Sequence, residues 1–265
     1  MSFRAAPPTE PLLALHAGLV SYSQAWEWQR SLVARRARDE IGDVVLTLEH
    51  PKVITAGRRA EPSHVLWSDE ERVARGVEFH QVDRGGEVTY HGPGQLVGYP
   101  VLRLSAIRRA VEYVRALEDL SMLTAGDFGV DARRVAGRTG VWVGDNKLVA
   151  IGVHVNSRAV TRHGFAFNVT TDLEDFAGIV PCGIADRGVC SLQSLGVEAT
   201  VADVLARLRV HVERVLGCIV KEAAFGDLGL TPVGPGGQAN MSAAPSERRE
   251  WSCLRSPKTA TEKIE

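Results

Sequence analysis

The chain has 265 residues, of which 45% are hydrophobic and 24% are charged, and its formal net charge is −1. These values are ordinary for a globular protein, they give no overall signature of nucleic-acid binding, and no run approaches the ~18 apolar residues of a membrane span. The first residues lack the apolar stretch of a secretory signal. The four cysteines show no close pair spacing, which argues against a disulfide framework or a metal knuckle, so a reducing, cytoplasmic setting is expected.

Hydrophobic spacing and turn residues divide the chain into mixed strands and helices. In chain order we predict a strand at 12–16, a helix at 22–40 capped by Ser21, strands at 43–49 and 53–56, a short helix at 68–75, a strand at 77–82, two strands flanking a turn at 92–94, a helix at 107–125, a hairpin at 141–155, a strand at 163–169, a helical turn at 172–176, a loop at 178–184 and a helix at 201–216. Several strands follow one another directly instead of alternating with helices. The sequence therefore predicts an α+β (α/β) fold with a mixed β-sheet flanked by helices.

The composition changes from about Gly226 onward, where Pro, Gly, Ser and charged residues replace large apolar side chains. Such a segment buries too little apolar surface to offset the entropy of ordering it. We therefore predict one folded domain at 12–225 and a disordered C-terminal tail at 226–265. The first eleven residues are expected to be frayed.

The most unusual stretch is RGGEVTYHGPGQLVGYP, from Arg84 to Pro100, which contains five glycines. Clustered glycines mark tight turns or places where the backbone approaches something closely. The sequence predicts a hairpin here, with Thr89, His91 and Gln95 near its turn. A glycine-rich hairpin with incidental polar residues remains an open alternative on this stretch alone.

Three further features have residue types suited to acyl chemistry. Cys182 lies between a proline and a glycine in a predicted loop, whereas Cys190 and Cys218 fit ordinary packing positions. Lys147 begins the second strand of the predicted hairpin at 141–155, where a lysine is most often a solvated turn residue. A lysine beside a thiol favours the thiolate and can later exchange protons. His163, like His91, is followed directly by glycine.

Together these segments closely resemble the lipoyl(octanoyl) transferase family. The resemblance covers roughly residues 12–217, and its most specific motif is the stretch from Arg84 to Pro100. The other matching segments follow in the family's order and are LEHP at 48–51, AGRR at 56–59, RTGVWV at 138–143, KLVAIGV at 147–153, HGFAFNV at 163–169 and IVPCGI at 179–184.

The resemblance implies the catalytic-domain fold of biotin and lipoate protein ligases. It also implies transfer of an octanoyl group from octanoyl-acyl carrier protein to the acceptor lysine of a lipoyl domain, the first step of lipoate cofactor biosynthesis. The acceptors would be lipoyl domains of 2-oxoacid dehydrogenase E2 subunits and the glycine cleavage H protein. No cofactor, metal, nucleic acid or membrane is expected.

The resemblance also implies the roles of single residues. Cys182 would be the acyl-thioester nucleophile and Lys147 the residue that favours its thiolate, with backbone N–H groups around Cys182 as candidates for an oxyanion hole. The substrate pocket would be formed by Arg84, Gly85, Gly86, Glu87, Val88, Thr89, Tyr90, His91, Ala150, Ile151, Gly152, Gly164, Phe165 and Ala166, supported by Gln95, His163 and Asn168.

Two alternatives stay open at this point. An ATP-dependent lipoate or biotin ligase on the same fold would need ATP and Mg²⁺ but no cysteine nucleophile. A thiol-dependent acyl hydrolase would release free octanoate without an acceptor, and a silent acyl-binding module would form no adduct. Because acyl carriers are typically acidic, five arginines could gather as a basic docking rim or remain scattered surface charges: Arg58, Arg59, Arg84, Arg108 and Arg109.

Overall fold

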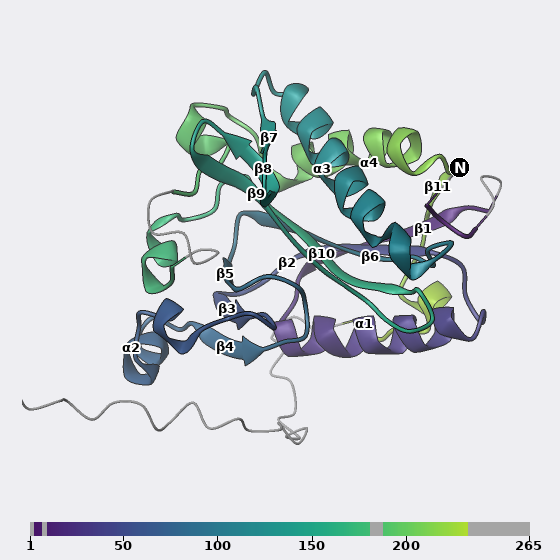
Figure 1. Ribbon diagram of the computed structural model, residues 1–265, viewed down its shortest axis with the longest axis horizontal. Helices are drawn as coiled ribbons and strands as arrows, with labels where there is room; N and C mark the ends of the chain where they lie inside the picture. The colour runs from purple at the N-terminus through teal and green to yellow at the C-terminus, as the bar shows by residue number, and fades with distance from the viewer. Residues whose placement is uncertain (1–2, 7–9, 181–187, 233–265) are drawn as a thin grey trace, which may run out of the picture.

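Two β-sheets of unequal size form the framework of the computed structural model, which describes residues 3–6, 10–180 and 188–232 (Figure 1). The strands are β1 (Leu12–Leu19), β2 (Val44–Glu49), β3 (Val53–Ala56), β4 (Glu78–Gln81), β5 (Val88–His91), β6 (Gln95–Val101), β7 (Arg133–Val135), β8 (Arg138–Val143), β9 (Asn146–Val155), β10 (Thr161–Asn168) and β11 (Val220–Glu222). The α-helices are α1 (Tyr22–Ala37), α2 (Asp69–Ala74), α3 (Ala110–Gly126) and α4 (Val201–Leu216).

In the described ranges, the larger sheet has eight strands in the order β11-β1-β2-β6-β10-β9-β8-β7, and the smaller has three in the order β4-β3-β5. In the large sheet, β1 runs parallel to β2 and β11. The remaining neighbours in that sheet, along the order β2-β6-β10-β9-β8-β7, pair in antiparallel fashion. The predicted mixed sheet flanked by helices is therefore confirmed.

Helices cover both faces of the large sheet, which explains why its central strand β6 is buried along its whole length (Figure 1). Side chains of a strand alternate between the two faces. Accordingly, Val44, Leu46 and Leu48 of β2 pack in one core with α1, while Val45 packs in the other with α3 and α4. This alternation fixes the register of the strands next to the site.

The predicted hairpin in the glycine-rich stretch is wrong, because β5 and β6 belong to different sheets. β5 pairs with β3, and β6 pairs with β2 and β10. The turn between them is tied to the large sheet, since the Gly94 N–H donates to Glu49 Oε2 (2.7 Å) and the Gly94 carbonyl accepts from Val169 and Thr170. Turn residues alone do not reveal whether the strands beside them pair.

Smaller differences concern the ends of elements. The first helix ends at Ala37 rather than at residue 40, because Asp39 adopts a left-handed conformation with φ of 60°. The edge strands β7 and β11 were not predicted, since each has only three residues and both carry charge. The last helix has the bounds predicted, Val201–Leu216.

The folded part of the chain also extends past both expected limits. Leu228 and Leu230, which the prediction placed in the tail, are buried in the core beside α1, because this short segment supplies the apolar side chains that close it. Arg4, expected to be frayed, is also buried. Residues 233–265 of the predicted tail lie outside the described residues. No helix in the described ranges is long and apolar enough to cross a membrane.

Asp43 connects the N-terminal segment to the large sheet and is fully buried. Its carboxylate accepts hydrogen bonds from Arg4 Nε (2.9 Å), Arg36 Nε (2.8 Å) and the Arg103 backbone N–H (2.9 Å). A buried ion pair that loses one partner leaves an uncompensated charge, which costs far more than loss of an exposed pair.

We predict that Asp43→Asn lowers the free energy of unfolding by about 3 kcal/mol, because two arginines lose their buried counter-charge. Urea-induced unfolding measures this change. Asp39→Asn is the matched control, since Asp39 pairs with Arg36 and Arg103 while its own side chain is 62% exposed. A similar loss in both variants would contradict the prediction.

Candidate active site

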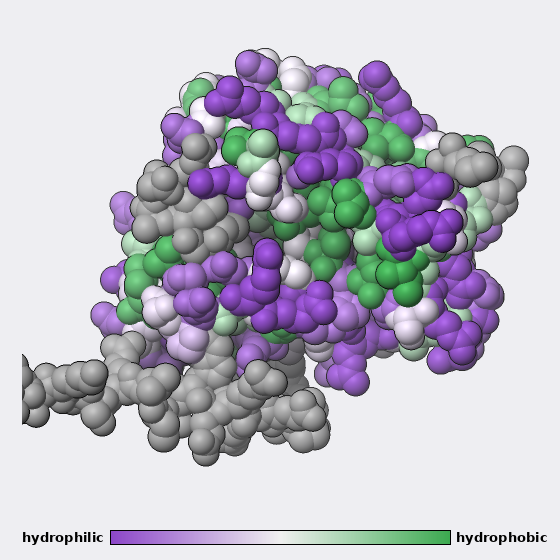
Figure 2. Space-filling model, in the orientation of Figure 1, coloured by the Kyte–Doolittle hydropathy of each residue, from purple (hydrophilic) through white to green (hydrophobic). Residues whose placement is uncertain are grey.

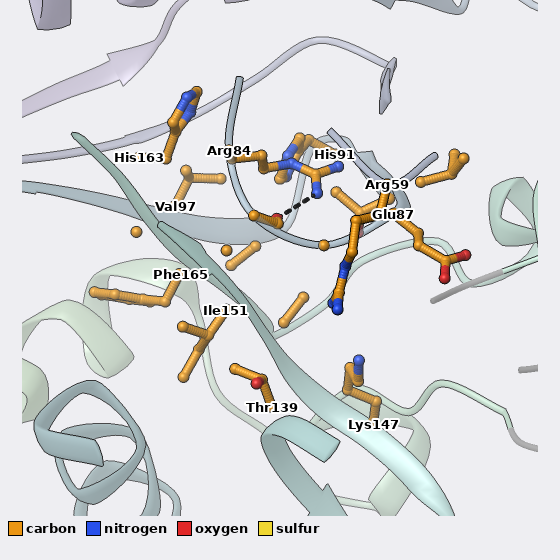
Figure 3. A pocket seen from close by; sticks show the side chains of 18 of the residues that line it. Arg59, Arg84, Glu87, His91, Val97, Thr139, Lys147, Ile151, His163 and Phe165 are labelled. Atoms are coloured by element: carbon orange, nitrogen blue, oxygen red, sulfur yellow. Dashed lines mark hydrogen bonds between the residues drawn. The ribbon is translucent and has the colours of Figure 1, made fainter. Parts of the chain in front are cut away.

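A cavity of about 180 Å³ opens where the glycine-rich loop before β5 meets strands β6, β8, β9 and β10 (Figure 3). It is lined by Tyr22, Arg59, Arg84, Gly85, Gly86, Glu87, Val88, Thr89, His91, Val97, Tyr99, Gly137, Arg138, Thr139, Lys147, Ala150, Ile151, Gly152, His163, Gly164, Phe165 and Ala166. The structure thus brings together Lys147, His163 and every residue expected in the substrate pocket except Tyr90.

Tyr90 faces away from the cavity because side chains alternate along β5. It packs in the core of the small sheet, and its hydroxyl donates to Asp175 Oδ2 (2.7 Å). The expectation that Tyr90 lines the pocket is therefore corrected, because Tyr90 belongs to the core of the small sheet.

Glycine allows the loop at 84–86 to lie directly on β9. The Gly85 N–H donates to the Val153 carbonyl (2.9 Å), and a Cβ placed on Gly152 would lie 3.0 Å from the Gly85 carbonyl oxygen and 3.1 Å from Arg84 Cδ. Any side chain at Gly152 would push the loop off the strand. This contact forms the wall of the cavity on the side of the small sheet.

Arg84 is a buried structural cation rather than part of a docking rim. Its Nη2 donates to the carbonyl (2.7 Å) and hydroxyl (2.9 Å) oxygens of Thr55, and its Nη1 donates to the Gly85 carbonyl (3.2 Å). These bonds tie the glycine loop to β3. Of the five arginines expected to form a rim, Arg59 lines the cavity and Arg109 pairs with Glu112.

A chain of buried side chains runs from His91 to the backbone of Cys190, whose N–H donates to the Lys147 carbonyl. His91 Nδ1–H donates to Gln95 Oε1 (2.7 Å), Gln95 Nε2 donates to Asn168 Oδ1 (2.8 Å), and Asn168 Nδ2 donates to the Cys190 carbonyl (2.9 Å). Because the amide oxygen of Gln95 can only accept, the proton of neutral His91 is on Nδ1. Gln95 and Asn168 thus support the site without lining it.

Burial keeps the histidines of the site uncharged. It lowers the pKa of His91 to about 3, with nearby His50 as the next cause. The pKa of His163 is also well below its usual value because the ring is buried and lies near Arg162 and Arg84, although its Nε2 donates to Asp83 Oδ1 (2.9 Å). Both rings therefore act as neutral hydrogen-bond donors at neutral pH.

Lys147 is buried, not a solvated turn residue. Its Nζ lies 4.7 Å from the centre of the Trp142 ring, and its stem passes Gly140, where an added Cβ would contact Lys147 Cε at 3.5 Å. Its backbone N–H donates to the Gly188 carbonyl (3.0 Å), and its carbonyl accepts from the Cys190 N–H (3.0 Å). The amine of Lys147 is thus placed at one end of the cavity (Figure 3).

Cys182 lies outside the described residues. Cys190 is buried and its pKa is raised to about 11 by that burial, while Cys218 follows α4 directly and its pKa is raised for the same main reason. Neither thiol lines the cavity. Of the cysteines that the structure describes, none is therefore placed or ionised as a nucleophile.

Several lining residues were not predicted. Tyr22 lies at the start of α1, distant in sequence from the other lining residues, and no local sequence signal marks it. Val97 and Tyr99 could have been found, because they share one face of β6 by alternation.

The part of the chain described holds no group of three or more His, Cys, Asp or Glu residues placed to bind a metal ion.

The chain is similar to known proteins over most of its length. Residues 21–213 match the family model described as the lipoyl protein ligase A/B catalytic domain. An octanoyltransferase of Acidobacterium capsulatum is 55% identical over 193 residues, which cover 68% of this chain and 78% of that protein. An octanoyltransferase of Chloroflexus aurantiacus is 50% identical over 204 residues, covering 76% and 92%.

The fold is similar to that of a bipartite lipoate protein ligase from Thermoplasma acidophilum. The TM-score is 0.59 at 16% sequence identity, and the match covers 81% of this chain and 86% of that one. This likeness concerns the fold alone.

The buried histidines predict a loss of stability in mild acid. His50 and His91 have native pKa values of about 4 and about 3, below the usual 6.5, so the unfolded chain binds protons that the native state excludes. Stability is then lost as pH falls below about 6.5. Urea unfolding should show that His91→Gln loses about 2 kcal/mol less than wild type between pH 7 and pH 5. Equal losses in the two proteins would refute this.

Proposed function

The chain belongs to the octanoyltransferases of the lipoyl protein ligase A/B catalytic domain family, and we propose that it moves an octanoyl group from acyl carrier protein to a lysine of a lipoyl domain. As an octanoyltransferase, it is an enzyme of protein lipoylation. The observation that supports the proposed reaction best is a single cavity that combines an apolar wall with the buried amine of Lys147.

The apolar wall suits an eight-carbon chain. Val97, Ile151 and Phe165 are apolar residues of the cavity lining and come from β6, β9 and β10 (Figure 3). Each buried CH₂ group contributes roughly 0.8 kcal/mol, so an octanoyl chain supplies several kcal/mol of binding free energy. Because Lys147 lies at one end of the cavity, the carbonyl carbon of a bound octanoyl chain would lie near a cation.

We propose Cys182 as the nucleophile that carries the octanoyl group as a thioester. Attack on a thioester requires a thiolate, and burial disfavours this form in both Cys190 and Cys218. The described residues on either side of the Cys182 segment are anchored at the cavity. The Val180 N–H donates to the carbonyl of His64, whose ring pairs with the cavity residue Glu87 at 2.8 Å, and the Gly188 carbonyl accepts from Lys147.

The proposed partners follow from this reaction. The donor is octanoyl-acyl carrier protein, and the acceptors are lipoyl domains of 2-oxoacid dehydrogenase E2 subunits and the glycine cleavage H protein. A cytoplasmic location goes with these partners and with the thiol chemistry. Transfer from a thioester should proceed without ATP, which distinguishes it from the reaction of a ligase with this fold.

We predict that Cys182→Ala abolishes the covalent intermediate. Wild-type protein incubated with octanoyl-acyl carrier protein should gain the mass of one octanoyl group, because the two half-reactions share one cysteine. Intact-protein mass spectrometry followed by peptide mapping locates the group. Cys190→Ala is the matched control and should still be acylated. A label on Cys190 or Cys218 would refute the assignment.

The proposed role of Lys147 predicts different defects in two variants. Lys147→Arg keeps the positive charge but cannot readily lose a proton, so it should still form acyl-enzyme yet transfer the group poorly. Lys147→Met should slow both half-reactions. The alkylation rate of Cys182 measured against pH should reach its midpoint at higher pH in Lys147→Met, because the thiolate loses a stabilising cation. Identical pH curves would show that Lys147 does not act on the thiol.

A further inference from the structure

Arg59 is held at the cavity by backbone hydrogen bonds although its side chain is exposed. After β3, the N–H groups of Gly57, Arg58 and Arg59 donate to the carbonyls of Glu87 (3.0 Å), Arg84 (3.1 Å) and Gly86 (3.2 Å). A Cβ on Gly57 would lie only 2.5 Å from the Gly86 carbonyl oxygen. The backbone of Arg59 is therefore fixed on the glycine loop.

The guanidinium of Arg59 extends into the cavity toward the part where the Lys147 amine lies (Figure 3). Among the described residues, no hydrogen bond or ion pair engages the Arg59 side chain. Glu87 is the carboxylate in the described lining, and its Oε2 lies 2.8 Å from His64 Nδ1. Two cations, Arg59 and Lys147, therefore approach the same part of the cavity. Because like charges repel, this arrangement suits a negatively charged ligand atom between them.

Most other donors of the described lining are already engaged. Arg84 donates to Thr55 and Gly85, His91 donates to Gln95, and His163 donates to Asp83. Arg138 also lines the cavity, and its Nη1 is buried without a hydrogen-bond partner in the described part of the chain. Arg59 and Arg138 are therefore the two arginines to compare.

We propose that the Arg59 guanidinium binds the oxygen of the acyl carbonyl and stabilises the oxyanion during transfer, a role that rests on the proposed function. As the enzyme thiolate bonds to the carbonyl carbon, the π electrons of the C=O bond move to oxygen. The C=O bond then re-forms, the bond from carbon to the donor sulfur breaks, and the donor leaves as a thiolate that takes up a proton. Arginine stays charged throughout and offers two parallel donors.

The experiment uses the octanoyl thioester of N-acetylcysteamine, a small donor that removes the effect of carrier docking. Acylation of the full-length enzyme is followed by rapid quench and mass spectrometry at varied donor concentration. Arg59→Met should lower the maximal acylation rate about 100-fold, the loss typical for one oxyanion donor, with little change in the half-saturating concentration. Arg59→Lys, which keeps the charge, should recover part of the rate.

Arg58→Met is the matched control, because Arg58 is the exposed neighbour that does not line the cavity, and it should keep the wild-type rate. Wild-type acylation by Arg59→Met would overturn the proposal. So would a loss confined to the carrier-bound donor, which would mark a docking residue, or a larger loss in Arg138→Met than in Arg59→Met. If wild-type enzyme gains no octanoyl group from either donor, the proposed function itself fails.

Discussion

The site depends on one close contact, between the glycine loop at 84–86 and strand β9. Gly85 bonds to Val153 in place of a strand partner, and Gly152 has no side chain to keep the loop away. Arg84 then ties the same loop to Thr55 of the small sheet. Because the loop contacts both sheets, their relative placement and the shape of the cavity are fixed together, and the clustered glycines have a structural role in the close contact.

Much of the fold follows from periodicity, while the pairing of β5 and β6 does not. The helix at Val201–Leu216 and the hairpin at 141–155 were predicted because their signals are local: a capped amphipathic run, and two apolar strands around a short turn. The turn at 92–94 carries the same residue types as a hairpin. Its direction is instead set by Glu49 and Thr170, which come from distant parts of the chain and leave no trace beside the turn.

The candidate site was predicted mainly through a family resemblance, and the structure explains where that approach stops. A motif identifies a stretch but not the direction of each side chain, so Tyr90 was included although alternation along β5 turns it into the core of the small sheet. The motif containing Arg59 was matched, yet Arg59 was considered only as part of a docking rim or as a scattered surface charge, because a sequence does not show the direction of a side chain. Tyr22 could not be found at all, since α1 reaches the cavity only through tertiary packing.

An apolar chain can lie in this cavity although many of its walls are polar. If CH₂ groups covered unsatisfied donors, those donors would be buried without a hydrogen-bond partner. That loss costs more free energy than the apolar contact gains. Here His91, His163 and Arg84 have already donated to protein acceptors, and burial keeps both imidazoles neutral. The two imidazoles therefore present neutral surfaces to the proposed acyl chain, and the Arg84 guanidinium is directed toward Thr55 and Gly85. Two cations of the lining, Lys147 and Arg59, lie at the end where a thioester would react under the proposed function.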